Sequence, residues 1–430
     1  MSWTPIDTWI CIISILCASA CALPGCILVL RRMSLMGDAI SHTVLPGIAI
    51  AFLVTGSREP TAMLIGAVII GLITAFLVQA IETLGKIETG AAIGIVFTVL
   101  FALGLVLMRQ AVDHVDIDPD CVLYGAVEFA YFDQIQIGSW SIPRAAIVNC
   151  IALLANAFII LILYKEFKIT AFDPALARTQ GIRPSMMHYL LMTMTAATAV
   201  AAFETVGSIL VIAMLIVPAS TAYLLTDKYG VMFVIAIGIA IIAAVGGHIS
   251  AVTIPPMFGF SGTSTAGAMA VVVGFLFLLA WIFSPKQGVW SASRRRKKVQ
   301  HGIIKDNILG LLWRLEERGQ TQSTISFESA LCVSRRAIWI ATQKLQKQES
   351  ICNDSTHWKL TEKGRNEASL IVRSHRLWES YLDKQFPQDA HQLHQSAERL
   401  EHITTAQMQS QLGDAEIDPH GSKVPPSPDT

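Results

Sequence analysis

Asp38 and His42 are two ionisable residues in an apolar part of the sequence, within the run GDAISHTVLPG. In a helix, a spacing of four places both side chains on one face, about one turn apart. A carboxylate oxygen together with an imidazole nitrogen suits a divalent transition metal better than calcium. The residues alone leave a second interpretation open, in which Asp38 caps the helix N-terminus and His42 makes an interhelical hydrogen bond.

A denser set of ionisable side chains occurs towards the end of the chain, with helical spacings of three and four. Its members are His375, Glu379, His394, Glu398, Glu401 and His402. On two adjacent helices, their nitrogen and oxygen atoms could surround a divalent metal. A polar helix face with local ion pairs is the alternative interpretation of the same spacing.

The parts of the chain that carry these two sets differ in composition. Of the 430 residues only 15% are charged, against about 25% in an average soluble domain. There are 11 basic and 15 acidic residues up to Ser284, and 21 basic and 17 acidic residues from Pro285 onward. The net charge of zero therefore averages a half at −4 and a half at +4. This division excludes a single soluble globule, and the eight cysteines form no CxxC pair that would indicate a disulfide framework or a zinc site.

Apolar runs that are long enough to cross about 30 Å of hydrocarbon as helices recur up to Phe283. Nine are predicted: Ile10–Leu30, Ala39–Thr55, Thr61–Ala80, Ala91–Met108, Ala145–Tyr164, Met187–Ala202, Ser208–Leu225, Val231–Ala251 and Gly267–Phe283. The less apolar segment Cys121–Trp140 is predicted to form a short or re-entrant helix. Glu204 and His248 are further but isolated metal-ligand candidates in this half, and a structural hydrogen bond inside the bundle is the favoured interpretation of each.

Basic residues mark the loops that face the cytoplasm. They follow the first, third, fifth and last spans. By the positive-inside rule, the N-terminus then lies outside the cell membrane and the C-terminal half lies in the cytoplasm. The acidic loop Asp113–Asp120 then lies outside, either as a solvated loop or as a mouth that attracts cations.

In the cytoplasmic loop Phe172–Ile182, Asp173 is a natural N-cap before Pro174, and Gly181 is a natural helix end. A short helix is predicted there, either as a docking surface or as a plain loop helix.

Several long motifs over nearly all of Met1–Ser284 resemble the manganese/iron/zinc ABC-transporter permeases, among them RRMSLMGDAISHTVLPGIAIAFL, TGAAIGIVFTVLFALGLVL, FDPALARTQGI and VGSILVIAMLIVPASTAYLL. The resemblance implies a permease that pairs with itself or with a second permease, binds a cytoplasmic ATPase and receives metal from an extracytoplasmic binding protein. It places Asp38 and His42 on the metal path. The implied coupling helix, which receives the ATPase stroke, includes Phe172, Asp173, Pro174, Ala177 and Gly181. No GxxxxGK[ST] run occurs, so ATP hydrolysis is expected on a separate subunit, and no organic cofactor is expected.

The charged half begins with a basic linker at residues 285–302, which could lie on anionic lipid, approach nucleic acid or simply anchor the topology. Residues 303–360 then predict a helix, a helix-turn-helix and two short strands, a pattern typical of a winged-helix DNA-binding domain but shared by small helical adaptor domains. The DNA-binding candidates on its second helix are Arg335, Arg336 and Lys344. Residues 361–410 predict a helical metal-binding and dimerisation segment, and residues 411–430 a disordered tail.

The motifs LTEKGR, SHRLWESYL and HQSAERLEH resemble the iron- and manganese-dependent repressors of the diphtheria-toxin-repressor type. This resemblance runs from about Ile304 to Met408 and implies that the six His and Glu residues named above are metal ligands. Glu398 stands where manganese-type members also have Glu, and an oxygen ligand there favours manganese. On the first helix, Asn307 stands where the family supplies Met or Asp, and Gly310 replaces a carboxylate.

The sequence therefore predicts an all-α polytopic membrane bundle followed by a cytoplasmic winged-helix and helical dimerisation domain. We expect the permease subunit of an ABC importer for manganese, with iron next and zinc as a further candidate. The C-terminal domain would sense metal and throttle transport, or act on DNA after proteolytic release. Two alternatives remain: a membrane-anchored metal-sensing regulator whose permease half does not transport, and a secondary metal carrier that needs no ATPase.

Overall fold

The computed structural model describes residues 3–56, 60–112, 127–137, 140–259, 263–319, 327–354, 357–385, 390–413 and 415–426. Contacts divide the chain into two compact units, Met1–Ser291 and Ala292–Thr430. Each unit has a hydrophobic core of its own. The acidic loop Asp113–Asp120 lies outside the described residues.

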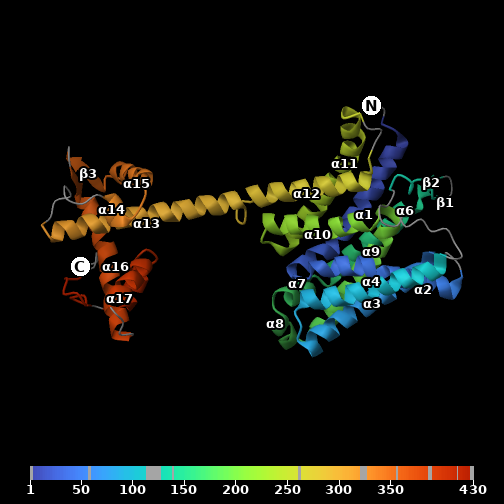
Figure 1. Ribbon diagram of the computed structural model, residues 1–430, viewed down its shortest axis with the longest axis horizontal. Coiled ribbons are helices and arrows are strands. Elements are labelled where there is room, and N and C mark those ends of the chain that lie inside the picture. Colours follow the sequence, from blue (N-terminus) through green and yellow to red (C-terminus); the bar gives the residue numbers. More distant parts are fainter. Residues whose placement is uncertain are drawn as a thin grey trace. The chain divides into compact units, whose positions relative to one another are not determined.

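The first unit is a bundle of long apolar helices (Figure 1). Eight helices within the described residues are long and apolar enough to cross a membrane: α1 (Pro5–Leu30), α2 (Ser34–Thr55), α3 (Pro60–Gly85), α4 (Thr89–Val112), α6 (Arg144–Ile162), α9 (Pro184–Val206), α11 (Tyr229–Met257) and α12 (Thr265–Phe283). The helix α10 (Ser208–Leu225) has a shorter apolar stretch, Leu210–Leu225, and corresponds to the seventh of the nine predicted spans. The bundle is therefore polytopic, as predicted.

Small residues let the helices of this bundle approach closely. Gly25 on α1 lies so near α10 that a Cβ atom there would overlap the carbonyl oxygen of Leu215. Gly47 on α2 and Gly66 on α3 face each other in the same way, because a Cβ atom on either one would overlap the backbone carbonyl oxygen of the other. Van der Waals packing of this kind is the main source of helix association in lipid, where the surrounding tails are as apolar as the side chains. Helices α2, α3 and α4 are consequently held together as one group (Figure 1).

The connection between α4 and α6 contains a small β-hairpin. The strands β1 (Gln134–Ile137) and β2 (Trp140–Pro143) pair antiparallel, with Gln134 opposite Pro143. Residues 127–132 before them form turns. The described part of Cys121–Trp140 is thus a turn and a hairpin, where the sequence predicts a short helix. Two short connecting helices, α7 (Tyr164–Phe172) and α8 (Pro174–Thr179), follow α6.

The second unit contains the predicted helical and winged elements. They are α13 (Val289–Glu317), which begins just before the unit boundary, α14 (Phe327–Leu331), α15 (Arg335–Lys347), β3 (Ile351–Asp354), β4 (His357–Leu360), α16 (Glu362–Gln385), α17 (Ala390–Glu401) and α18 (Ala406–Gln411). The strands β3 and β4 pair antiparallel and form the wing. A core that includes Ile308, Leu345 and Ala368 joins α13, α15 and α16.

The chain after α18 folds back as a hairpin, whereas the sequence predicts a disordered tail from residue 411. An isolated antiparallel bridge joins Ile417 to Lys423. The backbone N–H of Val424 also donates to the carbonyl of Glu416 at 2.9 Å. We call residues 415–426 the C-terminal hairpin.

Candidate metal centres

The first candidate centre is the pair Asp38 and His42 on α2. Their Oδ1 and Nε2 atoms are 3.4 Å apart, within one helical turn, and both side chains are only partly buried. The His42 ring lies against two aromatic rings of α4, with centroid distances of 5.6 Å to Phe97 and 5.7 Å to Phe101. Because α2 begins at Ser34 with Met33 as its N-cap, Asp38 lies inside the helix and does not cap it. Both groups are therefore side chains on one face of a span, which removes the capping interpretation of Asp38.

The candidate coupling helix is α8, whose N-terminus is fixed by Asp173. The Asp173 carboxylate accepts hydrogen bonds from the backbone N–H groups of Ala175 and Leu176, both at 3.0 Å. Pro174 occupies the first position of the helix, and Gly181 follows its end with φ of +79°. Ala177 is fully buried, whereas Phe172 is exposed. The helix is thus anchored on one side and presents the other to solvent.

The second candidate centre lies between α16 and α17. His375 Nε2 is 3.0 Å from Glu379 Oε1 and 3.0 Å from His394 Nδ1, and His394 Nδ1 is 2.8 Å from the same Glu379 oxygen. One ligand atom from each of these three residues lies within 4.8 Å of the other two. His375 and Glu379 are buried, and His394 is partly exposed. An oxygen and two nitrogens that converge in this way match the donor set of a divalent transition metal.

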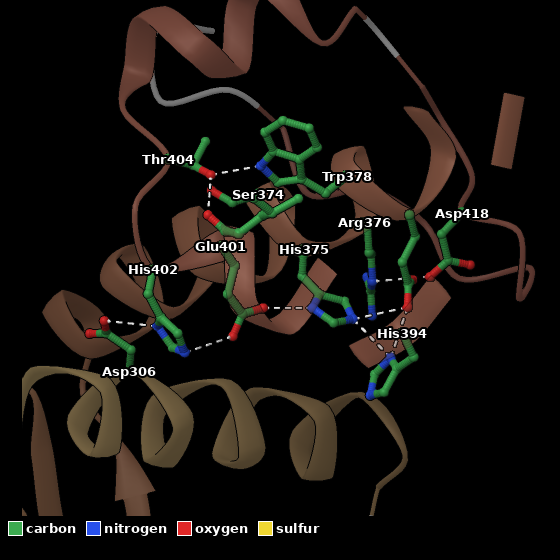
Figure 2. Close-up of polar contacts among 12 residues, drawn as sticks. Asp306, Ser374, His375, Arg376, Trp378, His394, Glu401, His402, Thr404 and Asp418 are labelled. Carbon is green, nitrogen blue, oxygen red and sulfur yellow. Dashed lines mark hydrogen bonds and ion pairs between the residues drawn. The ribbon is translucent and has the colours of Figure 1, made fainter. Parts of the chain in front are cut away.

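A second group of candidate ligand atoms continues from the first through Glu401 (Figure 2). One carboxylate oxygen of Glu401 is 2.6 Å from His375 Nδ1, and the other is 3.6 Å from His402 Nε2. His402 Nδ1 lies 3.3 Å from Oδ2 of Asp306 on α13. Glu401 therefore links the α16–α17 centre to a pair formed by α13 and the end of α17.

The charges in this region shift the pKa values of its members. Burial opposes a charge on His375, but hydrogen bonds to Glu379 and Glu401 outweigh it and raise the pKa of His375. The same balance, between burial and the hydrogen bond to Asp306, raises the pKa of His402. Burial would raise the pKa of Glu379, yet His375 and His394 hold that pKa at about 2. The region thus keeps a carboxylate ionised next to imidazoles that hold their protons more tightly than usual, so a divalent cation would bind here by displacing protons from the histidines.

The structure brings together five of the six ligand candidates of the C-terminal unit. The sixth, Glu398, is exposed and acts on His402 through its charge. Asp306, rather than Asn307, faces His402, and sequence reasoning missed it because neighbouring positions on a helix point about 100° apart. The side chain of Glu204 lies outside the described residues.

His248 and the basic helix α15 match simpler expectations. The buried His248 ring forms hydrogen bonds with Asp7 at 3.2 Å and Thr265 at 3.3 Å, as predicted for a structural role inside the bundle. The three DNA-binding candidates are exposed on α15: Arg335, Arg336 and Lys344. Arg335 also pairs with Glu328 at 3.5 Å.

Two family models match the chain, one in each unit. The ABC 3 transport family matches residues 6–284, and the domain described as iron dependent repressor, metal binding and dimerisation domain matches residues 361–426. The chain therefore belongs to the ABC 3 transport family, as a multi-pass membrane protein with a repressor-type metal-binding and dimerisation domain at its C-terminal end. This agrees with the two resemblances seen in the sequence.

Individual relatives support the same assignment. The chain is 40% identical to the manganese transport system membrane protein MntD of Bacillus subtilis (strain 168), over 68% of this chain and 97% of that protein. It is 38% identical to the zinc transport system membrane protein TroD of Treponema pallidum (strain Nichols), over 65% of this chain and 74% of that protein. The solved structure of PsaBC from Streptococcus pneumoniae in complex with Fab matches with 30% identity and a TM-score of 0.55, covering 66% of this chain and 94% of that chain.

Proposed function

We propose that this chain is the permease subunit of an ABC importer for a divalent transition metal, with manganese as the first candidate, iron next and zinc third. The observation that carries the proposal is the Asp38–His42 pair, whose ligand atoms are 3.4 Å apart on one face of α2 within a bundle of family-typical spans. An intramembrane ionisable pair is expensive to place in lipid and marks an ion path more often than a structural contact. The Asp38 carboxylate oxygen and the His42 imidazole nitrogen would bind the transported cation transiently. The aromatic rings of Phe97 and Phe101 would restrict rotation of the His42 side chain.

ATP hydrolysis on a separate cytoplasmic subunit would drive this transport through α8. The exposed Phe172 and Leu176 offer an apolar contact surface beside the Asp173 cap. Arg178 of α8 also lines a cavity together with Arg31 and Arg32 at the end of α1, which gives the same region a positive charge. The cap satisfies two backbone N–H groups at the start of α8 and so stabilises this short helix as a contact element.

The positive-inside rule supports an orientation in which α8 and the C-terminal unit are cytoplasmic and the N-terminus is outside. In that orientation an extracytoplasmic binding protein delivers the metal, and a second permease subunit completes the pathway. The basic run Arg294–Lys298 would then lie near the anionic inner leaflet of the cell membrane.

The C-terminal unit would bind the same metal on the cytoplasmic side and report its concentration. His375, Glu379 and His394 supply the converging ligands of one centre. Asp306, Glu401 and His402 supply a neighbouring set, which Glu398 completes in the family resemblance. Nitrogen and oxygen donors without thiolate favour manganese or iron over softer cations, and occupancy that rises with cytoplasmic metal would slow further import.

DNA binding is a second candidate function of the C-terminal unit. The helix α15 follows a helix-turn-helix geometry, with Cys332 in the turn at φ of +51°, and it is next to the wing formed by β3 and β4. Its exposed Arg336 and Lys344 would contact phosphates, so binding would weaken as salt rises. Titration of the full-length protein with duplex DNA at two salt concentrations tests this; binding that ignores salt and survives Lys344→Ala would contradict it.

Metal uptake by membrane vesicles that contain the chain and its ATPase tests the transport proposal. We expect ATP-dependent uptake of radioactive manganese, and competition by unlabelled manganese, iron and zinc in decreasing order. Uptake that persists without the ATPase would instead indicate a secondary carrier. If vesicles that contain the chain, its ATPase, its binding protein and any second permease subunit take up no metal, the transport proposal is wrong. The membrane-anchored sensor would then be the remaining interpretation.

A further inference from the structure

The C-terminal hairpin is an ordered structure with a histidine at its tip. Inside it, one oxygen of the buried Asp418 carboxylate accepts hydrogen bonds from the backbone N–H groups of His420 at 3.0 Å and Ser422 at 2.7 Å. Gly421 adopts φ of +82°, which other residues rarely adopt, and this lets the chain reverse direction there. These contacts fix the backbone of His420 while its side chain remains 44% exposed.

Two arginines of α16 attach the hairpin to the helix that carries His375. Arg373 donates a hydrogen bond to the carbonyl of Pro425 at 2.6 Å. Arg376 donates to the carbonyl of Lys423 and faces Asp418, with Nε 3.5 Å from Oδ2. Arg376 and Asp418 are both buried, and Arg376 follows His375 directly in the sequence. The hairpin is therefore attached to Arg376, the residue next in sequence to the metal-ligand candidate His375.

This attachment brings His420 to the open side of the α16–α17 centre. Its Nε2 atom is 3.7 Å from Glu379 Oε1, the same oxygen that His375 and His394 approach at 3.0 and 2.8 Å. Three imidazole nitrogens thus converge on one carboxylate oxygen. Because the His420 side chain is half exposed, rotation about its own side-chain bonds can bring Nε2 closer without moving the hairpin backbone.

We propose that His420 is a fourth ligand of this centre, so that binding of a divalent cation holds the C-terminal hairpin in its docked position. The proposal rests on the metal centre proposed above, and adds a regulatory part to it. Three protein ligands leave coordination positions open on a divalent transition metal, and a fourth ligand from the chain would fill one of them. Metal binding and docking of the hairpin then favour one another, because coupling between two equilibria is reciprocal. The hairpin would be the element that distinguishes the metal-bound from the metal-free C-terminal unit.

The test uses the full-length protein with Asp38→Ala and His42→Ala, so that the transport site does not contribute to the metal binding measured. Manganese affinity is determined by competition with a chelating dye for this background and for the same protein with His420→Ala added. His301→Ala is the matched control, since His301 is another partly exposed histidine of this unit and contacts the Lys297 carbonyl of its own helix. His420→Glu supplies an alternative ligand at the same place.

We expect His420→Ala, which removes a direct ligand, to weaken manganese binding by at least about the 10- to 100-fold that loss of an outer-shell partner costs. His301→Ala should have no effect, and His420→Glu should restore part of the affinity. As a second readout, manganese should slow tryptic cleavage after Lys423 in the background protein and not in His420→Ala.

Two results would overturn the proposal, and they differ in what else they affect. If His375→Ala abolishes binding while His420→Ala changes neither affinity nor cleavage, the metal centre exists but the hairpin is not part of it. If His375→Ala leaves manganese affinity unchanged, the centre itself is wrong and the hairpin proposal falls with it.

Discussion

Oε2 of Glu401 lies 2.6 Å from Nδ1 of His375, and the Nε2 atom of the same ring faces Glu379 and His394. A carboxylate that binds one ring nitrogen of a histidine fixes the orientation of the ring and leaves the other nitrogen for a metal. Because Glu401 stands at the end of α17 and His375 lies within α16, this contact also ties the two helices together (Figure 2).

Replacement of Glu401 by Gln should therefore weaken the C-terminal metal centre. We expect about a 10- to 100-fold loss of manganese affinity, because Gln keeps the shape but lacks the charge that orients and polarises His375. Dye competition with the full-length protein carrying Asp38→Ala and His42→Ala measures it. Glu362→Gln, at an exposed position at the start of α16, is the control. Equal affinities for the Glu401 and Glu362 variants would show that Glu401 does not support the centre.

The pair formed by Glu317 and Arg376 predicts how the C-terminal hairpin responds to pH. Glu317 Oε2 lies 2.6 Å from Arg376 Nη2, and this hydrogen bond lowers the pKa of Glu317 below its usual value of 4.5. A carboxyl group with a lowered pKa in the folded state stabilises that state above its unfolded pKa, and loses this contribution as pH falls through the folded one. The contribution of the Glu317–Arg376 pair to attachment of the hairpin should thus be constant from pH 7 to 5 and weaken only below 4.5.

Proteolysis of the hairpin by an acid-tolerant protease measures this pH dependence. The hairpin of the Glu317→Gln variant should be cleaved faster than that of the parent protein at neutral pH. The cleavage rates of the two proteins should approach each other as the pH falls. The interpretation is wrong if the variant and the parent lose protection in parallel, with a constant difference at every pH.

Loss of the Asp173 cap should impair transport without removing the chain from the membrane. Asp173→Ala leaves the N–H groups of Ala175 and Leu176 without their acceptor and costs α8 about 0.5–2 kcal/mol. We expect reduced ATP-driven manganese uptake at unchanged protein level. Asp173→Asn keeps a capping oxygen and should retain most of the uptake, so a similar loss in both variants would indicate a role for the charge instead of the cap.

Gly25 should tolerate no larger residue. In Gly25→Ala the new Cβ meets the backbone of Leu215, so α1 and α10 must separate, and overpacking of this kind costs about 1–3 kcal/mol. Gly238→Ala, on α11, is the control because no atom lies within 4 Å of its Cβ position. Thermal stability in detergent, followed by size-exclusion chromatography, should fall for the Gly25 variant alone. An unchanged midpoint for Gly25→Ala would contradict the close packing of α1 and α10.

The spans and the winged elements could be predicted from the sequence because their signal is local. Runs of about 20 apolar residues and helical spacing of His and Glu are visible without any tertiary contact. The N-terminal end of α2 was harder to place, since the polar residues of SLMGDA do not look like part of a span, although the helix begins at Ser34. This is why Asp38 could be mistaken for a cap.

The parts that could not be predicted depend on contacts between distant residues. Asp306 meets His402 across 96 positions of the chain, and no local pattern distinguishes it from Asn307. His420 lies in a Pro- and Ser-containing tail whose composition predicts disorder, and the buried Arg376 is what holds that tail in place. Sequence pattern finds residues on one helix face, whereas these two required the fold.

Manganese uptake by the Asp38→Ala, His42→Ala double variant tests the central claim most directly. The chain is reconstituted with its ATPase and its binding protein, and Asp227→Asn, at an exposed carboxylate that pairs with Lys286, is the control. We predict that ATP-dependent uptake is abolished in the double variant and normal in the control, with both proteins folded and present in equal amounts. Uptake by the double variant at the rate of the parent protein would contradict a metal path through Asp38 and His42.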